Sequence, residues 1–169
     1  MLVEVVVSEL LLDQKNRVPI VVLKDLAGGR RLPIWIGHQE ASVIAMELSE
    51  RKFQRPLTHD LLNNVLKGLD AKLSRVEIVD LIENTFYAKI FIDSGGEVVC
   101  IDARPSDSIA LALKAKARIY VDPKLFSSEL DSLLTETSKA ADEDVDTSAE
   151  DLKDFIENLD PKDFGKFRF

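Results

Sequence analysis

The chain has 169 residues, of which 46% are hydrophobic and 31% charged, and its formal net charge is −8 at pH 7. This length supports one ordinary hydrophobic core, so we expect one main domain. The acidity lies toward the C-terminus: residues 1–126 hold 17 acidic and 17 basic side chains, whereas residues 127–169 hold 13 and 5. The neutral body lacks the basic stripe of a tight duplex-binding protein, although it is compatible with a local phosphate site.

The cysteine content and the apolar runs exclude further classes of protein. Cys100 is the single cysteine, which excludes an internal disulfide and a cysteine-based zinc site. Its place inside an apolar run predicts a buried, inert thiol. The N-terminal run has no basic start and contains Glu4 and Ser8, so it predicts a strand rather than a signal peptide. Because no segment reaches the roughly 18 apolar residues of a membrane span, we expect a soluble, cytoplasmic protein with no membrane partner.

The first part of the main domain predicts strands followed by a helix. Apolar and β-branched runs predict strands over residues 2–12, 18–24 and 31–36. The glycines at the end of residues 25–30 predict a hairpin between the second and third of these strands. An apolar period of 3.6 residues predicts a helix from Ala41 to Leu48, and a short strand is expected around Phe53.

The second part predicts the same kinds of element in a similar order. A second helix is expected to begin near Thr58, whose side chain is suited to cap it. Further strands are expected over residues 72–82, 85–93, 97–102 and 118–121. A tight turn at Glu83-Asn84 and a turn at residues 94–96 are expected to join the first three of them. Between the last two strands, an apolar segment from Ser106 to about Lys116 predicts a third helix.

An internal repeat links the two parts. Residues 32–48 (LPIWIGHQEASVIAMEL) resemble residues 98–113 (VVCIDARPSDSIALAL), with matched apolar positions 65 apart, from Ile34 and Val99 to Leu48 and Leu113, and a different polar turn. The repeat predicts a duplicated unit of three strands, a helix and a short strand, and thus an α+β fold with a largely antiparallel sheet and packed helices. Because the third helix is apolar on more than one face, a dimer contact is expected there.

The C-terminal residues predict two further segments beyond the domain at residues 1–126. Residues 127–149 are acidic and rich in Ser and Thr, which predicts a mobile linker. An apolar stripe over residues 152–159 then predicts a short amphipathic helix within residues 150–169. Such a helix is too short to be stable alone, so we expect it to dock on the body or on a partner.

Two Arg-Pro sequences are the candidate functional sites. Arg55-Pro56-Leu57-Thr58-His59-Asp60 and Arg104-Pro105-Ser106-Asp107 each place an arginine, a hydroxyl residue and an aspartate at an expected helix start. One interpretation is structural, because Pro, Ser or Thr, and Asp all stabilise helix N-termini. The other is functional, because a helix N-terminus beside an arginine can hold a phosphate.

The functional interpretation assigns a role to each polar residue. Arg55 and Arg104 would bind substrate phosphate. Asp102 and Asp107 would form a carboxylate pair for Mg²⁺ or Mn²⁺, a cation that can activate an attacking water. His59, with Asp60 beside it, would handle protons as a general base, a role that His38 or Glu40 could also fill.

Four segments together resemble one known family. They are LPIWIG at 32–37, RPLTHDLL at 55–62, NTFYAKI at 84–90 and DARPSDSIALAL at 102–113, and the C-terminal FIENLDPKDFGK is similar to an extension in bacterial members. The chain is similar over residues 1 to about 126 to the bifunctional nuclease family. The resemblance implies an α+β fold built from a duplicated unit, a tendency to dimerise, and nuclease activity on DNA and RNA. It makes the polar residues of the matched motifs candidates for the active site: Arg55, His59, Asp60, Asp102, Arg104 and Asp107.

Two hypotheses of function follow. The first is a cytoplasmic, metal-assisted nuclease that cleaves DNA and RNA with low sequence selectivity and forms a homodimer. The alternative is a non-catalytic binding or regulatory module that recruits a protein partner. In that module the same arginines and aspartates would form ion pairs that fix the helix starts.

Overall fold

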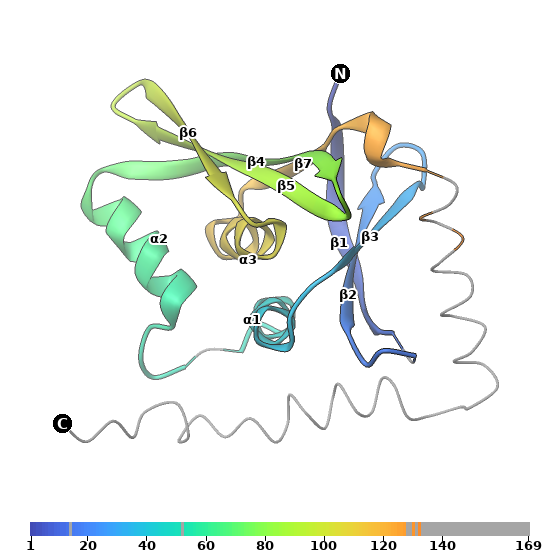
Figure 1. Ribbon diagram of the computed structural model, residues 1–169. Helices are drawn as coiled ribbons and strands as arrows, with labels where there is room; N and C mark the ends of the chain where they lie inside the picture. Colours follow the sequence, from blue (N-terminus) through green and yellow to red (C-terminus); the bar gives the residue numbers. More distant parts are fainter. Residues whose placement is uncertain (14, 52, 128–129, 131, 133–169) are drawn as a thin grey trace.

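A single sheet organises the part of the chain that the computed structural model describes, residues 1–13, 15–51, 53–127, 130 and 132 (Figure 1). In these residues the strands are β1 (Val3–Leu12), β2 (Pro19–Asp25), β3 (Arg31–Trp35), β4 (Ala71–Ile82), β5 (Thr85–Ser94), β6 (Glu97–Ala103) and β7 (Arg118–Val121). Their order across the sheet is β3-β2-β1-β7-β4-β5-β6. Neighbouring strands are antiparallel except β4 and β7, which are parallel. The predicted α+β class with a largely antiparallel sheet is confirmed.

The helices contact the same apolar core, which lies on one face of the sheet (Figure 1). They are α1 (His38–Leu48), α2 (Thr58–Gly68) and α3 (Pro105–Ala115), and a short 3-10 turn, η1 (Pro123–Leu125), follows β7. In the described residues none of these helices is long and apolar enough to cross a membrane.

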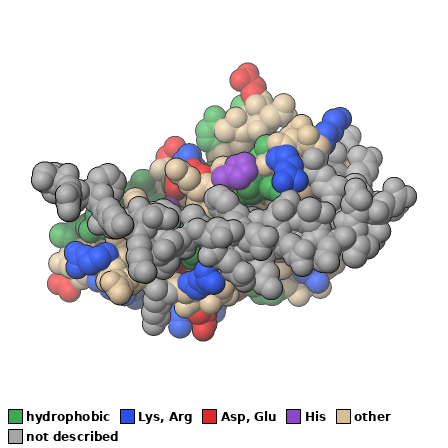
Figure 2. All heavy atoms as spheres, turned by 90° about the horizontal axis from the view of Figure 1, so that it is seen from below, with side chains coloured by type: hydrophobic (Ala, Val, Ile, Leu, Met, Phe, Trp, Pro, Cys, Tyr) green, Lys and Arg blue, Asp and Glu red, His purple; other side chains and the backbone are tan. Residues whose placement is uncertain are grey.

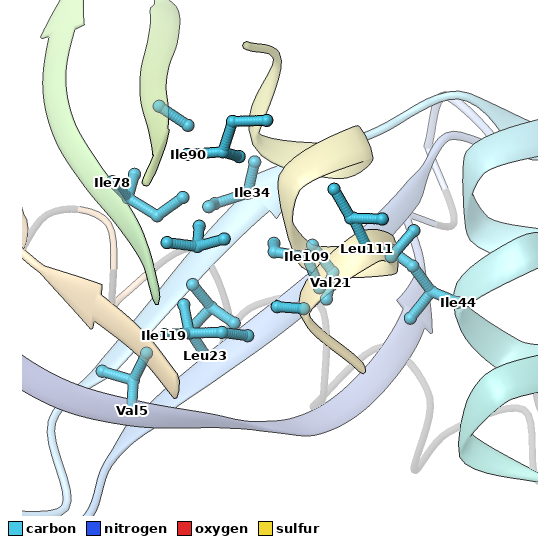
Figure 3. Packing of buried hydrophobic residues seen from close by; sticks show 14 of the residues in the cluster. Val5, Val21, Leu23, Ile34, Ile44, Ile78, Ile90, Ile109, Leu111 and Ile119 are labelled. Atoms are coloured by element: carbon cyan, nitrogen blue, oxygen red, sulfur yellow. The ribbon is translucent and has the colours of Figure 1, made fainter. Parts of the chain in front are cut away.

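The central helix is α3, which contacts β4, β5, α1 and α2. Figure 3 shows Ile109 and Leu111 of α3 in the core. They lie between strand residues such as Ile78 on one side and Ile44 of α1 on the other. The α3 faces that predicted a dimer contact are thus covered within one chain, since Ile109 and Leu111 are at most 1% exposed. The prediction of a dimer surface at α3 was wrong for this reason, and a homodimer by other surfaces stays a prediction.

The order of strands and helices along the chain agrees in part with the two similar halves that the sequence predicts. Three strands and a helix occur in both, as β1-β2-β3-α1 and β4-β5-β6-α3. The short strand expected around Phe53 was wrong, because residues 53–57 form no strand and lead into α2. Strand β7 joins the halves by pairing with both β1 and β4. The duplication itself stays a prediction.

The hairpins of the second half follow from local turn chemistry. Glu83 and Asn84 join β4 to β5 with φ of 48° and 60°, and Gly95 and Gly96 join β5 to β6 with φ of 63° and 91°. Positive φ at both central residues matches the right-handed twist of a two-residue hairpin, and Asn and Gly adopt it at the lowest cost. The predicted positions of these turns are confirmed.

Strand β6 lies at an edge of the sheet and is more exposed than its sequence predicts. Cys100 is exposed, so the prediction of a buried thiol was wrong. The apolar sequence predicted a strand at these residues. It did not reveal that this strand would have a neighbouring strand, β5, on one side only. The predicted C-terminal helix within residues 150–169 lies outside the described residues, as does nearly all of the predicted linker.

Replacement of the central core residue tests this packing. We expect Ile109→Ala, at a side chain that is 0% exposed, to lower the free energy of unfolding by about 3 kcal/mol, because it removes buried methyl groups and leaves a cavity. Val98→Ala on β6, 57% exposed, is the control and should cost less than about 0.5 kcal/mol. Urea denaturation measures both, and equal losses would contradict the position given to α3.

Candidate functional site

The starts of α1, α2 and α3 meet at one hollow of about 680 Å³, called here the small hollow. Its polar lining comes from α1, α2 and the start of α3, as Gln39, Glu40, Ser42, Thr58, His59, Arg104 and Asp107. A helix N-terminus presents unpaired backbone N–H groups and the positive end of the helix dipole. Several such ends beside an arginine favour the binding of an anion.

The helix starts are formed by different contacts from those that the sequence predicts. Helix α3 begins with Pro105 after Arg104, which has an extended backbone, and α2 begins at Thr58 after Leu57. The prediction that Thr58 and Ser106 cap these helices was wrong, because the N-cap residues are Leu57 and Arg104, and neither forms a side-chain capping hydrogen bond. At α2 the Oδ2 atom of Asp60 accepts a hydrogen bond from the backbone N–H of Leu57 at 2.9 Å.

One network of polar side chains crosses the small hollow. His59 Nε2 lies 3.1 Å from Asp107 Oδ1, and Arg104 Nε donates to Asp107 Oδ2 at 2.7 Å. Arg104 Nη1 lies 3.0 Å from Glu40 Oε1. We call Glu40, His59, Arg104 and Asp107 the histidine network. It connects α2 to α3 and α3 to α1, so it brings together residues 48 positions apart in the chain.

The histidine network keeps Asp107 ionised. Burial would raise the pKa of Asp107, but the hydrogen bonds and charges of Arg104 and His59 outweigh burial and lower it below the usual value. Because an ionised carboxylate only accepts hydrogen bonds, the nitrogen facing it, Nε2, carries a proton, and Nδ1 is the basic nitrogen of a neutral ring. Asp107 thus orients the imidazole, as the carboxylate does in acid-base pairs of enzymes.

A second charged cluster lies beside the first. Lys114 Nζ contacts Glu47 Oε1 and lies 2.5 Å from Asp60 Oδ1, which connects α3 to α1 and α2. We call these residues the Lys114 cluster. Burial would lower the pKa of Lys114, but hydrogen bonds to Asp60 and Glu47 outweigh it and raise the pKa. Burial would likewise raise the pKa of Asp60, yet Lys114 and the Leu57 N–H lower it.

The residues predicted from the sequence are distributed over four places. His59, Arg104 and Asp107 lie together in the histidine network, and Asp60 belongs to the Lys114 cluster. Arg55 is exposed and lines an adjoining hollow. Asp102 is exposed on β6, where Ala103 pairs with the buried Ala88, so alternation directs Asp102 to the sheet face away from the helices.

Lys114 and Glu47 were not among the residues predicted from the sequence. Lys114 follows the apolar run at residues 109–113 and lies seven residues after Asp107, so the helical period places both on one face. That spacing was the available signal. Their partners on α1 and α2, however, depend on helix packing that the sequence did not reveal.

A divalent cation does not fit the side chains as they are arranged. Both carboxylate oxygens of Asp107 are in contact with His59 or Arg104, and Asp102 points to the other face of the sheet. Across the described residues, no group of three or more His, Cys, Asp or Glu side chains could hold a metal ion. The cation on Asp102 and Asp107 stays a prediction of the sequence.

Figure 2 views the helix side of the molecule and shows a histidine side chain at the surface near acidic, basic and apolar groups. The class that fold and site define is an α+β domain with a histidine, an aspartate and an arginine in contact at its helix starts.

Comparison with known proteins identifies the family. The model of the bifunctional nuclease domain matches residues 21–132, which include most of β2 and every later element of the described fold. A Mycobacterium tuberculosis protein named as uncharacterized is 37% identical over 162 residues, 95% of this chain and 97% of that protein. The chain belongs to the bifunctional nuclease domain family, which confirms the resemblance found in the sequence.

More distant relatives carry the name of the activity. Bifunctional nuclease 1 of Arabidopsis thaliana is 25% identical over 115 residues, 66% of this chain and 35% of that protein. Bifunctional nuclease 1 of Oryza sativa subsp. japonica is 21% identical over 97 residues, 56% of this chain and 29% of that protein. The present chain thus matches about a third of each plant protein.

Removal of the charge at the centre of the Lys114 cluster tests its contribution to stability. We expect Lys114→Met to lower the free energy of unfolding by about 2 kcal/mol, because it leaves Glu47 and Asp60 facing each other without a cation. This value is below that of a fully buried pair, since the two carboxylate side chains are 22% and 32% exposed. Lys72→Met is the matched control: its side chain is 77% exposed and it should cost less than about 0.5 kcal/mol.

The pH dependence of this loss gives a second readout. Because the folded-state pKa of Asp60 is lowered, its stabilisation is present above its unfolded pKa and is lost as the pH falls through the folded value. The difference between wild type and Lys114→Met should therefore be constant near neutral pH and shrink below about pH 4. Urea denaturation over this range measures it, and a difference that grows on acidification would contradict the pairing.

Proposed function

We propose that the protein hydrolyses phosphodiester bonds of nucleic acids at the small hollow. The observation that carries this proposal is the contact of His59 with Asp107, with Arg104 bound to the same carboxylate. A base, the group that orients it and a phosphate-binding cation are thus within one network. The family and the names of its plant members support nucleic acid as the substrate.

The proposed reaction uses the side chains of the histidine network. Arg104 is 66% exposed, and its donors that do not contact Asp107 or Glu40 would bind a phosphate oxygen together with the helix N-termini. His59 would take a proton from a water at Nδ1 as the water oxygen attacks phosphorus. The bond from phosphorus to the leaving oxygen breaks, that oxygen takes a proton from a solvent water, and the His59 imidazolium then releases its proton to solvent. Asp107 would stabilise the charged imidazolium.

Assistance by Mg²⁺ or Mn²⁺ is the finer form of the proposal that the sequence suggests. A cation on Asp107 would have to exchange with the Arg104 guanidinium, whose Nε is 2.7 Å from Oδ2. Metal dependence of cleavage is therefore an outcome to be measured. The cytoplasmic location and the homodimer expected from the sequence belong to the same proposal.

A non-catalytic module that recruits a protein partner is the second candidate. It is favoured by one observation: Glu40, Asp60 and Asp107 each contact a basic side chain, as a structural role at helix starts requires. The acidic C-terminal residues would then recruit the protein partner by binding to it.

Substitutions in the histidine network distinguish these candidates. With full-length protein and labelled single-stranded DNA or RNA, we expect His59→Gln and Asp107→Asn each to lower the cleavage rate by about 10²-fold or more, because the base or its orienting carboxylate is lost. Arg104→Gln should lower it by about 10²-fold, since a donor to the charged phosphate is lost. The assay is run with EDTA, with Mg²⁺ and with Mn²⁺, and circular dichroism verifies folding.

Asp102→Asn is the matched control. It removes a carboxylate from the other sheet face, so we expect cleavage within about twofold of wild type. A large loss in Asp102→Asn, with cleavage that requires a metal and survives His59→Gln, would instead support the metal pair. Absence of cleavage by the wild-type protein under all conditions would favour the non-catalytic module.

A further inference from the structure

We infer that a second hollow beside His59 is a phosphate-binding subsite for single-stranded nucleic acid, with Arg55, Lys67 and Lys116 as its cations. The inference rests on the proposed function and specifies where the strand lies on either side of the reacting bond. We call this site the large hollow, because its volume is about 910 Å³.

The large hollow adjoins the small hollow at the proposed base. It lies between the end of α1, residues 50, 51 and 53–57, one side of α2 and the end of α3. Both hollows are lined by Pro56, Leu57 and His59. A strand with its reacting phosphate at His59 and Arg104 would therefore have adjacent nucleotides in the large hollow.

The charge of the large hollow favours a polyanion. Five basic and three acidic residues line it, and two of the acidic ones, Glu47 and Asp60, contact Lys114. The side chains of Arg55, Lys67 and Lys116 are exposed, and none makes an ion pair or hydrogen bond with another described residue. They come from three different segments of the chain, yet they border the same hollow.

A purely structural role explains these cations only in part. Lys67 lies in the last turn of α2 and Lys116 follows α3, so both complement the negative end of a helix dipole. Arg55 precedes a helix, where a positive charge is unfavourable. The position of Arg55 beside the same hollow is therefore better explained by a bound anion than by the helix dipole.

The shape of this region favours a single strand over a duplex. The cations line a recess beside α2, whereas a rigid duplex is bound by a long basic stripe, and residues 1–126 have equal numbers of acidic and basic side chains. Proteins that bind single strands without sequence preference use a positively charged groove that follows the backbone, together with aromatic side chains. Phe53 supplies an aromatic ring in the lining of the large hollow.

The salt dependence of strand binding tests the subsite. Full-length protein carrying His59→Gln keeps the probe intact, and fluorescence anisotropy measures its affinity for a labelled single-stranded oligonucleotide. We expect Arg55→Gln, Lys67→Gln and Lys116→Gln each to reduce the slope of log affinity against log salt by about 0.7, and to weaken binding about fivefold at 0.1 M salt. The triple variant should reduce the slope by about 2.

Matched variants and probes control for charge and folding. Lys24→Gln removes an exposed positive charge on the sheet face opposite α1 and should leave the slope unchanged. Arg55→Lys and Lys67→Arg keep the charge and should keep the slope. An oligonucleotide of the same sequence with an uncharged methylphosphonate backbone should bind the triple variant and its parent equally.

An unchanged slope and affinity in the triple variant would overturn the inference. So would a loss in Lys24→Gln equal to that in Arg55→Gln, or weakened binding of poly-glutamate with unchanged binding of the oligonucleotide. Failure of the proposed function gives a different result, in which wild-type protein cleaves nothing while the strand still binds through these cations.

Discussion

Charged contacts between α1, α2 and α3 are the interactions on which the rest of the site depends. Apolar burial fixes α3 against the sheet, but apolar contacts have little directionality and do not by themselves set where neighbouring helices start. The histidine network and the Lys114 cluster supply that direction, because each connects all of these helices through hydrogen-bonded side chains. The small hollow exists where these contacts hold the helix starts together.

Side chains of these two groups therefore stabilise the helix packing and also lie where the proposed reaction takes place. Asp107 contacts a histidine and an arginine, and Asp60 both contacts Lys114 and accepts the backbone N–H of Leu57. The two charged groups differ in exposure: Lys114 is 12% exposed, whereas Arg104 is 66% exposed. The buried cluster is suited to hold the helices, and the exposed arginine is suited to meet a ligand. In the proposed reaction the substrate would therefore contact Arg104 without breaking the contacts of Lys114 that hold the helices together.

Local chemistry made much of the fold predictable, and tertiary position limited the rest. The turns at Glu83-Asn84 and Gly95-Gly96 depend on adjacent residues only, so their hairpins were predicted correctly. Cys100 was predicted wrongly because alternation does not reveal which strand lies at an edge. Residue type and the Arg-Pro sequences made His59, Arg104 and Asp107 candidates. That these side chains lie in contact depends on how α2 packs on α3, which the sequence did not predict. Asp102 was paired with Asp107 by proximity in sequence, whereas strand alternation directs it to the other sheet face.

A double-mutant cycle on cleavage tests most directly whether His59 and Asp107 act as one unit. The specificity constant kcat/KM is measured for wild type, His59→Gln, Asp107→Asn and the double variant, all with verified folding. If Asp107 acts through the imidazole, the double variant should lose no more activity than the more damaging single variant. Losses that multiply would show that the two side chains act independently, and would contradict the shared site between α2 and α3.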